Sequence, residues 1–170
     1  MKIAIVLASE TKNLELANRI EAEIKRIGGE PNIIKLIDLD LPLYTSRAEK
    51  LHSPSDLLAP VLGQIHEAHG FVFIAPEYNG STPPILTNFL AWVSRSTKNW
   101  RENLNGKPAA LATYSGGPGF NVLLAMRSQL SYIGMNIVGR TLQFNSNIDF
   151  NEEDIKGVIE QLSKLARNQH

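Results

Sequence analysis

The sequence predicts an α/β fold in which five parallel strands are covered by helices on both faces. Short apolar segments alternate with helical patterns from end to end, the segments are nearly continuous in hydrophobicity, and turn residues separate them. A chain of 170 residues fits one domain, which we expect to span residues 1–170. Strand–helix–strand units of this kind are right-handed, so the carboxyl ends of all strands lie at one edge of the sheet.

Each of the five expected strands is a short apolar run. Residues 3–7 are apolar without interruption, as in a strand covered on both faces. Residues 70–75 (GFVFIA) give the strongest strand signal in the chain. The other expected strands are residues 32–39, 109–113 and 136–142.

Five helices are expected between and after these strands, each with apolar residues at helical spacing. Gly28 and Gly29 end the first helix, and Pro83 and Pro84 open the third, because proline is tolerated in a first turn. The apolar positions of the five helices lie in residues 16–27, 57–65, 85–93, 122–133 and 155–165.

Composition excludes several classes of function. The chain has no cysteine, which excludes disulfides, thiolate nucleophiles and cysteine metal sites and suits a cytoplasmic protein. Seventeen basic and seventeen acidic side chains cancel, which argues against nucleic-acid binding and against an acidic electron carrier that docks by charge. The N-terminal apolar run is too short to span a bilayer, so we expect no membrane association.

In an open sheet of this type, ligands bind beyond the carboxyl ends of the strands. The loop after the first strand leads into a helix with two hydroxyls, an amide and Lys12, a set that can surround a phosphate at a helix N-terminus. An ordinary helix cap would use the same residue types. The loop lacks both G-x-G-x-x-G and G-x-x-x-x-G-K-[ST], so dinucleotide binding of the Rossmann type and P-loop chemistry have no support.

The loops after the third and fourth strands suit a flat ligand. Residues 76–84 (PEYNGSTPP) combine an ordered turn with an aromatic ring, a carboxylate and backbone N–H groups, the mixture that a flat heteroaromatic ring requires. The alternative is a turn in which Tyr78 only covers the end of the sheet. Residues 115–119 (SGGPG) let a ligand approach the backbone closely. A plain glycine turn would look the same, but its place beside the previous loop favours a ligand site.

The string P-E-Y-N-G-S at residues 76–81 resembles the NADPH-dependent FMN reductase family, which includes related quinone, azo and chromate reductases. The resemblance covers nearly the whole chain, including residues 38–44 (DLDLPLY), 106–108 (GKP) and 115–117 (SGG). It implies a three-layer flavodoxin-like fold with strand order 2-1-3-4-5. It also implies an FMN that is reduced by NADPH or NADH and passes electrons to flavin, quinone or a similar small acceptor.

The resemblance further implies a homodimer or homotetramer with the flavin near a subunit boundary, and it assigns the FMN contacts. No catalytic side chain is expected, because the flavin carries the chemistry. The residues that match the family's cofactor site are Ser9, Thr11, Asn13 and Leu14 for the phosphate, Pro76, Glu77, Tyr78 and Asn79 along the ring, and Ser115, Gly116 and Gly117 at its other edge.

Two departures from the family pattern leave alternatives open. Ala8 replaces a glycine in the first loop, which is shortened and lacks an arginine, and Thr87 and Ala91 replace a lysine and an aspartate before Trp92. One alternative is a flavodoxin-type electron carrier, against which the neutral charge counts. The other is a protein that keeps the fold, no longer binds flavin and acts through protein contacts.

Three further groups of residues have two interpretations each. Trp92 and Trp100, with Phe89, could line a ligand, but on an apolar helix face such residues are more often core or interface. Arg95, Lys98 and Arg101 could attract the phosphate of the nicotinamide nucleotide, but such residues are usually solvated surface. His66 and His69 have a spacing that could hold a metal, but surface polarity explains them better, and we predict no metal site.

Overall fold

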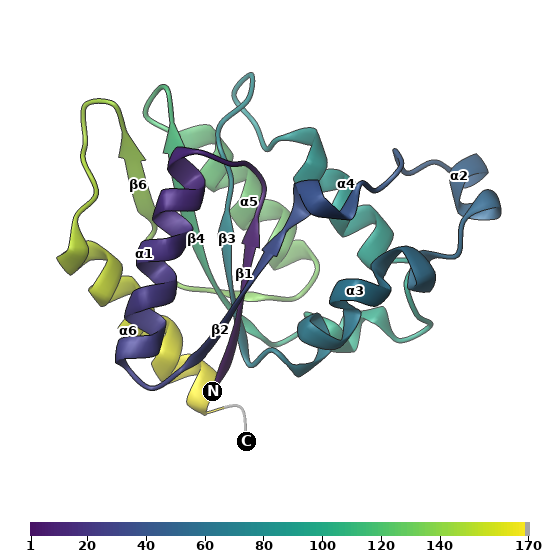
Figure 1. Cartoon of the computed structure of the whole chain (residues 1–170), viewed down its shortest axis with the longest axis horizontal. Coiled ribbons are helices and arrows are strands. Elements are labelled where there is room, and N and C mark those ends of the chain that lie inside the picture. The colour runs from purple at the N-terminus through teal and green to yellow at the C-terminus, as the bar shows by residue number, and fades with distance from the viewer. Residues whose placement is uncertain (169–170) are drawn as a thin grey trace.

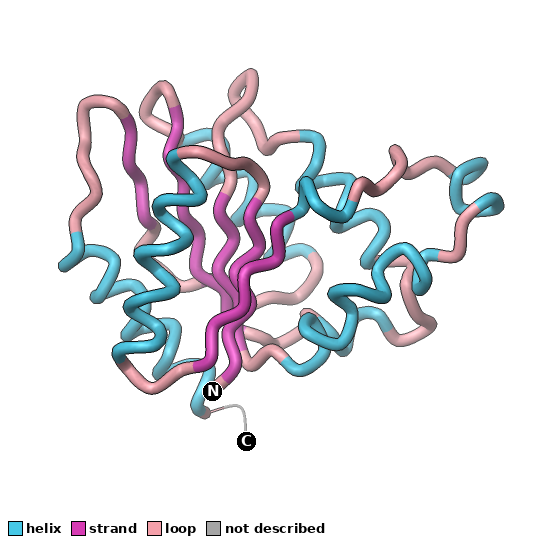
Figure 2. Tube along the Cα trace, in the orientation of Figure 1, coloured by secondary structure: helices cyan, strands magenta, loops and turns pink. Residues whose placement is uncertain are grey.

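A parallel sheet forms the centre of the computed structural model, which describes residues 1–168 (Figures 1 and 2). The strand order is β2-β1-β3-β4-β5, so the predicted order is confirmed. All pairs are parallel, and the carboxyl ends of the strands lie together at the top of Figure 1. The first four strands are β1 (Lys2–Leu7), β2 (Glu30–Lys35), β3 (Gly70–Ile74) and β4 (Pro108–Ser115).

The fifth strand differs from the prediction of one strand at residues 136–142. It is divided into β5 (Asn136–Ile137) and β6 (Leu142–Asn145), which pair with successive parts of β4. The residues between them bulge out of the sheet, and Arg127 Nη2 donates to the freed carbonyl oxygens of Val138 at 3.0 Å and Gly139 at 3.2 Å. The second strand was also predicted too long, because it ends at Lys35 and Leu36–Leu39 form a 3₁₀ helix, η1.

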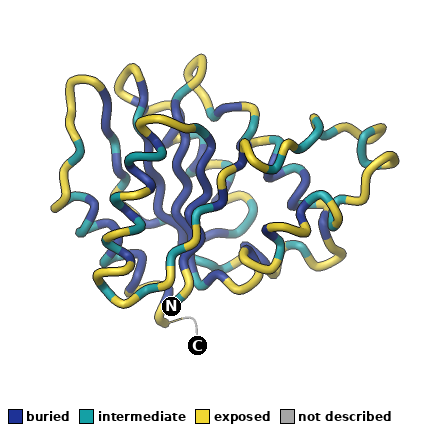
Figure 3. Tube along the Cα trace, viewed as in Figure 1, coloured by how far each residue is buried: buried dark blue, intermediate teal, exposed yellow. Residues whose placement is uncertain are grey.

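Helices cover both faces of the sheet, as predicted, and the central strands between them are buried (Figure 3). Alternate residues of each central strand enter two separate cores. Ile3 and Ile5 of β1 face one core, whereas Ala4 and Val6 face the other. The first core packs against α1 (Lys12–Arg26) and α6 (Glu152–Arg167), and the second against α3 (Pro54–Glu67), α4 (Pro84–Val93) and α5 (Phe120–Tyr132).

A sixth helix, α2 (Ser46–Leu51), was not predicted. It lies in the segment that projects at the right of Figure 1 and begins at Thr45, whose Oγ1 accepts the N–H of Ala48 at 2.9 Å. The base of this segment is fixed to α4, because the indole Nε1 of Trp92 donates to the carbonyl oxygen of Pro42 at 2.7 Å. Trp92 is fully buried and is therefore a core residue.

No helix within residues 1–168 has the length and apolar character needed to cross a membrane.

Lys107, the residue before β4, caps the C-terminal end of α3. Its Nζ donates to the carbonyl oxygens of Ile65 at 3.1 Å and His66 at 2.8 Å and lies 5.7 Å from the ring centroid of Phe71. Burial lowers the pKa of Lys107 to about 8. This lysine thus loses its proton in the folded protein at a lower pH than in the unfolded chain.

We expect Lys107 to make the free energy of unfolding increase with pH between about pH 8 and pH 10. In this range the unfolded chain binds more protons at Lys107 than the folded protein does. Urea unfolding across this range measures the effect. Lys107→Met should remove the contribution, whereas Lys164→Met, at an exposed position on α6, should keep it. An unchanged pH profile in Lys107→Met would contradict the expectation.

Candidate functional site

The loops predicted to form the site leave the sheet at one edge. Residues 8–11 follow β1, residues 75–83 follow β3 and residues 116–119 follow β4. All three lie at the top of Figure 1, and most of their residues are exposed in Figure 3. Three loops with different side chains therefore lie at one end of the molecule.

The loop after β1 presents the free end of α1. Thr11 precedes the helix with a φ of 53°, and its carbonyl oxygen accepts the N–H of Glu15 at 3.0 Å. The N–H groups of Lys12, Asn13 and Leu14 precede that first helical bond, so they lack intrahelical acceptors. Together with the hydroxyls of the loop they can bind an anion.

Asn13 is 4% exposed, and its side chain faces the protein. Its Nδ2 donates to Ser9 Oγ at 3.0 Å and to the carbonyl oxygen of Tyr114 at 2.9 Å, while its Oδ1 accepts the N–H of Tyr114 at 2.8 Å. The predicted contact of Asn13 with a phosphate is thereby limited to its backbone N–H.

The cations beside this loop are held by carboxylates. Lys12 Nζ lies 2.9 Å from Glu15 Oε2, and Arg19 binds the other oxygen of Glu15 at 3.0 Å as well as the carboxylate of Glu152. Hydrogen bonds from Lys12 and Arg19 lower the pKa of Glu15, so this carboxylate is ionised at neutral pH. A phosphate at the start of α1 would compete with Glu15 for Lys12.

The loop after β3 contains a tight hairpin turn. The N–H groups of Tyr78 and Ser81 donate to each other's carbonyl oxygens at 3.0 Å, and φ is 50° at Asn79 and 73° at Gly80. Two successive positive φ angles define a type I′ turn, which the Asn-Gly pair favours. The turn holds Tyr78 at the surface with half of its area exposed.

Glu77 joins this loop to the next one. Its backbone N–H donates to Ser115 Oγ at 2.8 Å, and its Oε2 accepts the N–H groups of Asn121 at 2.9 Å and Val122 at 3.1 Å at the start of α5. A carboxylate at a helix N-terminus also interacts favourably with the helix dipole. The backbone N–H and one carboxylate oxygen of Glu77 are thus bound within the protein.

The glycines after β4 leave an open surface. Apart from the glycine and its two chain neighbours, no atom of residues 1–168 lies within 4 Å of a Cβ built on Gly116 or on Gly117, and neither has φ in the left-handed region. Gly119 differs, because its φ is 74° and an added Cβ would lie 2.8 Å from Thr113 Cγ2. The first two glycines leave room for a ligand, whereas the third is required by the turn.

Sequence reasoning missed one contributor at this edge. Phe150, in the loop after β6, lies with its ring centroid 5.5 Å from that of Tyr114 and 5.7 Å from Lys12 Nζ. The sequence predicts a fifth strand that ends at residue 142, and it contains no signal that places Phe150 beside α1.

The other candidates lie elsewhere. Arg95 and Arg101 follow α4, which returns the chain to the opposite edge of the sheet, and they contact Glu49 and the Trp100 ring respectively. The histidines have separate partners, since His66 Nδ1 bonds to Asn103 Oδ1 at 3.0 Å and His69 Nδ1 accepts the N–H of Lys2 at 3.1 Å. Within residues 1–168, no three histidine or acidic side chains form a group that could hold a metal.

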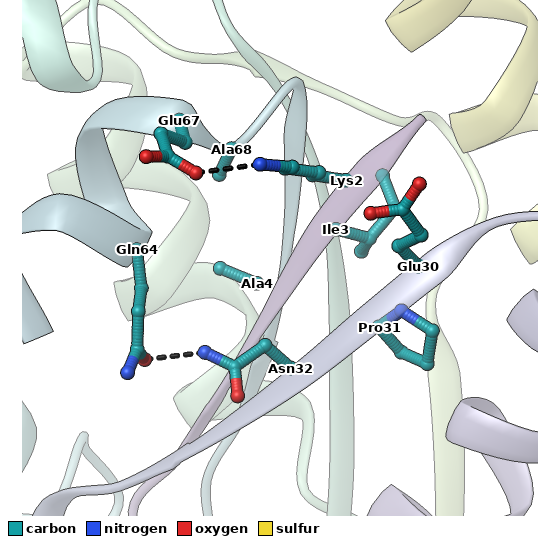
Figure 4. A pocket seen from close by; sticks show the side chains of 9 residues that line it. All are labelled: Lys2, Ile3, Ala4, Glu30, Pro31, Asn32, Gln64, Glu67 and Ala68. Carbon is teal, nitrogen blue, oxygen red and sulfur yellow. Dashed lines mark hydrogen bonds and ion pairs between the residues drawn. The ribbon is translucent and has the colours of Figure 1, made fainter.

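A hollow of about 210 Å³ is also remote from the three loops (Figure 4). It is lined by the first residues of β1 and β2 and by the end of α3, with the ion pair of Lys2 and Glu67 at its rim. These are the amino ends of the strands, so the hollow and the loops occupy opposite edges of the sheet.

Comparison with known proteins gives one consistent family. The family described as NADPH-dependent FMN reductase matches residues 1–149. A 2-hydroxy-1,4-benzoquinone reductase from Burkholderia sp is 32% identical over 129 residues, which are 69% of this chain and 62% of that protein. A quinone reductase from Escherichia coli (strain K12) is 35% identical over 78 residues, and the match covers 46% of this chain but only 40% of that protein.

The fold is shared with a solved flavoenzyme. The structure of FerB, an NAD(P)H:(acceptor) oxidoreductase from Paracoccus denitrificans, superposes with a TM-score of 0.80 at 18% identity and covers 98% of this chain and 97% of that one. The predicted flavodoxin-like architecture is confirmed.

Proposed function

The chain belongs to the NADPH-dependent FMN reductase family, and we propose that the loops after β1, β3 and β4 hold its FMN. Its function is FMN-dependent transfer of electrons from NAD(P)H to a flavin or quinone acceptor. The proposed position of the flavin rests on one observation. The start of α1, the exposed Tyr78 and the open pair Gly116 and Gly117 lie at one edge of the sheet.

The residues present fit FMN. The hydroxyls of Ser9 and Thr11 and the N–H groups of Asn13 and Leu14 offer donors to a phosphate. The Cβ positions of Gly116 and Gly117 are open within residues 1–168, so side chains do not keep a ring away from the backbone there. In this assignment the ring borders are Pro76, Glu77, Tyr78 and Asn79 on one side and Ser115, Gly116 and Gly117 on the other.

The chain's own groups orient the cofactor and stabilise charge. Bound FMN supplies the acceptor of hydride and the donor of electrons. The N–H groups of Tyr78 and Ser81 each donate to the other residue's carbonyl oxygen. Within residues 1–168 the backbone N–H groups of Asn79 and Gly80 have no backbone acceptor, so they can meet a ring edge. Backbone donors at such positions stabilise negative charge on a reduced ring without any movement of side chains.

We also propose a cytoplasmic homodimer or homotetramer. Support for self-association comes from α5, whose outer surface exposes Phe120, Leu124 and Tyr132 at intervals that place them on one side of the helix. Light scattering on the purified chain measures the oligomeric state, and a monomer at micromolar concentration would contradict the proposal.

The function is tested on freshly purified protein by identifying the released ligand and following NADPH and NADH oxidation with FMN or a quinone. We expect FMN to be released or taken up and steady NAD(P)H oxidation without a partner protein. Flavin binding without such oxidation would indicate an electron carrier, and neither flavin binding nor oxidation would contradict the assignment.

Glu15→Gln should raise the affinity for FMN by about fivefold at low ionic strength, because it removes a negative charge beside the phosphate and frees Lys12. Titration of flavin fluorescence measures the change. Riboflavin, which lacks the phosphate, should bind as before, and Glu23→Gln, in the last turns of α1 where it pairs with Arg26, should have no effect. Equal or weaker binding of FMN to Glu15→Gln would contradict this expectation.

A further inference from the structure

The amide of Asn13 takes the place of a missing strand neighbour. β3 and β4 remain paired up to Ala112, whose carbonyl oxygen accepts the N–H of Ala75 at 3.2 Å, and β3 then leaves the sheet. Tyr114 is two residues further along β4, so its N–H and carbonyl face the same side. Asn13 binds both groups at once, with its Oδ1 and its Nδ2, from 101 residues away in the sequence.

This arrangement uses the full geometry of a primary amide. One acceptor and two donors lie in one plane, and the second donor binds Ser9 Oγ. The start of α1 is consequently fixed to the residue that precedes Ser115 and the two open glycines. An aspartate of the same shape would place an oxygen against the carbonyl of Tyr114.

Glu77 provides a second connection, between the loop after β3 and both ends of the loop after β4. Its N–H reaches Ser115 Oγ, which is also 2.7 Å from Thr113 Oγ1 in the core. Its carboxylate reaches the first turn of α5. The turn that contains Gly116 and Gly117 is thereby bounded on one side by the contact with Asn13 and on the other by the contacts with Glu77.

We infer that Asn13 and Glu77 are positioning residues, which hold the three loops in a ligand-ready arrangement by bonds to the protein and not by side-chain bonds to the flavin. The inference rests on the proposed function. Asn13 fixes the position, relative to β4, of the start of α1 that receives the phosphate. Glu77 fixes the positions of the two ring-bordering loops relative to each other.

The two residues should leave different signatures on binding. A change at Asn13 displaces the phosphate loop, so the affinity for FMN falls while that for riboflavin is retained. A change at Glu77 displaces the ring-bordering loops, so the affinities for FMN and riboflavin fall by the same factor and the absorption bands of the bound flavin shift. Asn13→Asp loses part-buried hydrogen bonds and Glu77→Gln loses the charge that strengthens its bonds to α5, and either loss supports an effect of about tenfold.

The experiment compares Asn13→Asp and Glu77→Gln with the wild type by flavin titration and by amide hydrogen exchange of the flavin-free protein. We expect faster exchange at Tyr114 and residues 9–14 in the first variant and at residues 77, 121 and 122 in the second. Asn136→Ser and Glu67→Gln are matched controls at the opposite edge, where Asn136 Nδ2 bonds to the carbonyl of Gly106 and Glu67 pairs with Lys2.

Asn13→Ser and Ser115→Ala replace the first two variants if urea unfolding shows that either is not folded. Weaker flavin binding with unchanged exchange at the partner loop would overturn the inference, because it indicates direct contact. Faster exchange with unchanged flavin binding would also overturn it. Failure of the proposed function would look different, because the wild-type protein itself would then not bind flavin.

Discussion

Gly119→Ala should lower the free energy of unfolding by about 2–5 kcal/mol. The left-handed backbone at φ 74° costs an alanine about 1–2 kcal/mol. The new Cβ would also lie 2.8 Å from Thr113 Cγ2, and such overlap in a packed interior adds about 1–3 kcal/mol. Thr113 cannot easily move away, because it is fully buried, stiff at χ1 and hydrogen-bonded to Ser115.

Urea unfolding followed by circular dichroism measures this loss, and Gly28→Ala separates its two causes. Gly28 has a similar φ of 76°, but no atom of the described chain, residues 1–168, lies within 4 Å of an added Cβ. The Gly28 variant should lose only the backbone contribution. Equal losses at the two glycines would show that Thr113 does not restrict position 119.

Most of the fold was predictable because it depends on local composition. The strands at residues 3–7 and 70–75 are continuous apolar runs, and burial on both faces of a covered sheet requires such runs. The bulge between β5 and β6 was not predictable, since it is stabilised by Arg127 from α5 binding two carbonyl oxygens. Leu36–Leu39 resembled a strand in composition, but these residues form a 3₁₀ turn instead.

Short elements without a buried face give little signal. α2 has six residues and none of them is buried, so no apolar periodicity marks it. Its start depends on the cap by Thr45 and on the attachment of the preceding segment to Trp92.

For the candidate site, the loops could be predicted but the roles of their side chains could not. Parallel strands place the loops after β1, β3 and β4 at one edge whatever the detailed contacts are. The resemblance to the family assigns Asn13 and Glu77 to the flavin because they match its motifs. Their hydrogen bonds go to Tyr114, Asn121 and Val122, and such long-range pairings have no local signature in the sequence.

A double variant, Gly116→Val with Gly117→Val, should weaken FMN binding by about 100-fold or more and leave stability unchanged or slightly raised. Both positions have open space around an added Cβ in the flavin-free protein, and replacing glycine reduces the freedom of the unfolded chain. Consecutive residues direct their side chains to different sides of the backbone, so the pair fills the space over the turn whichever side the ring occupies. Filling a ligand site costs several kcal/mol, which corresponds to this loss of affinity.

Fluorescence titration with FMN and with riboflavin, beside urea unfolding, measures both effects on the same samples. The two flavins should lose affinity together, because the obstruction lies where the ring is proposed to bind and not at the phosphate. Gly119→Ala differs from the double variant, because its main expected effect is a loss of stability. Undiminished FMN binding by a folded double variant would mean that the ring lies elsewhere, and the assignment of the loop after β4 to the flavin would then be wrong.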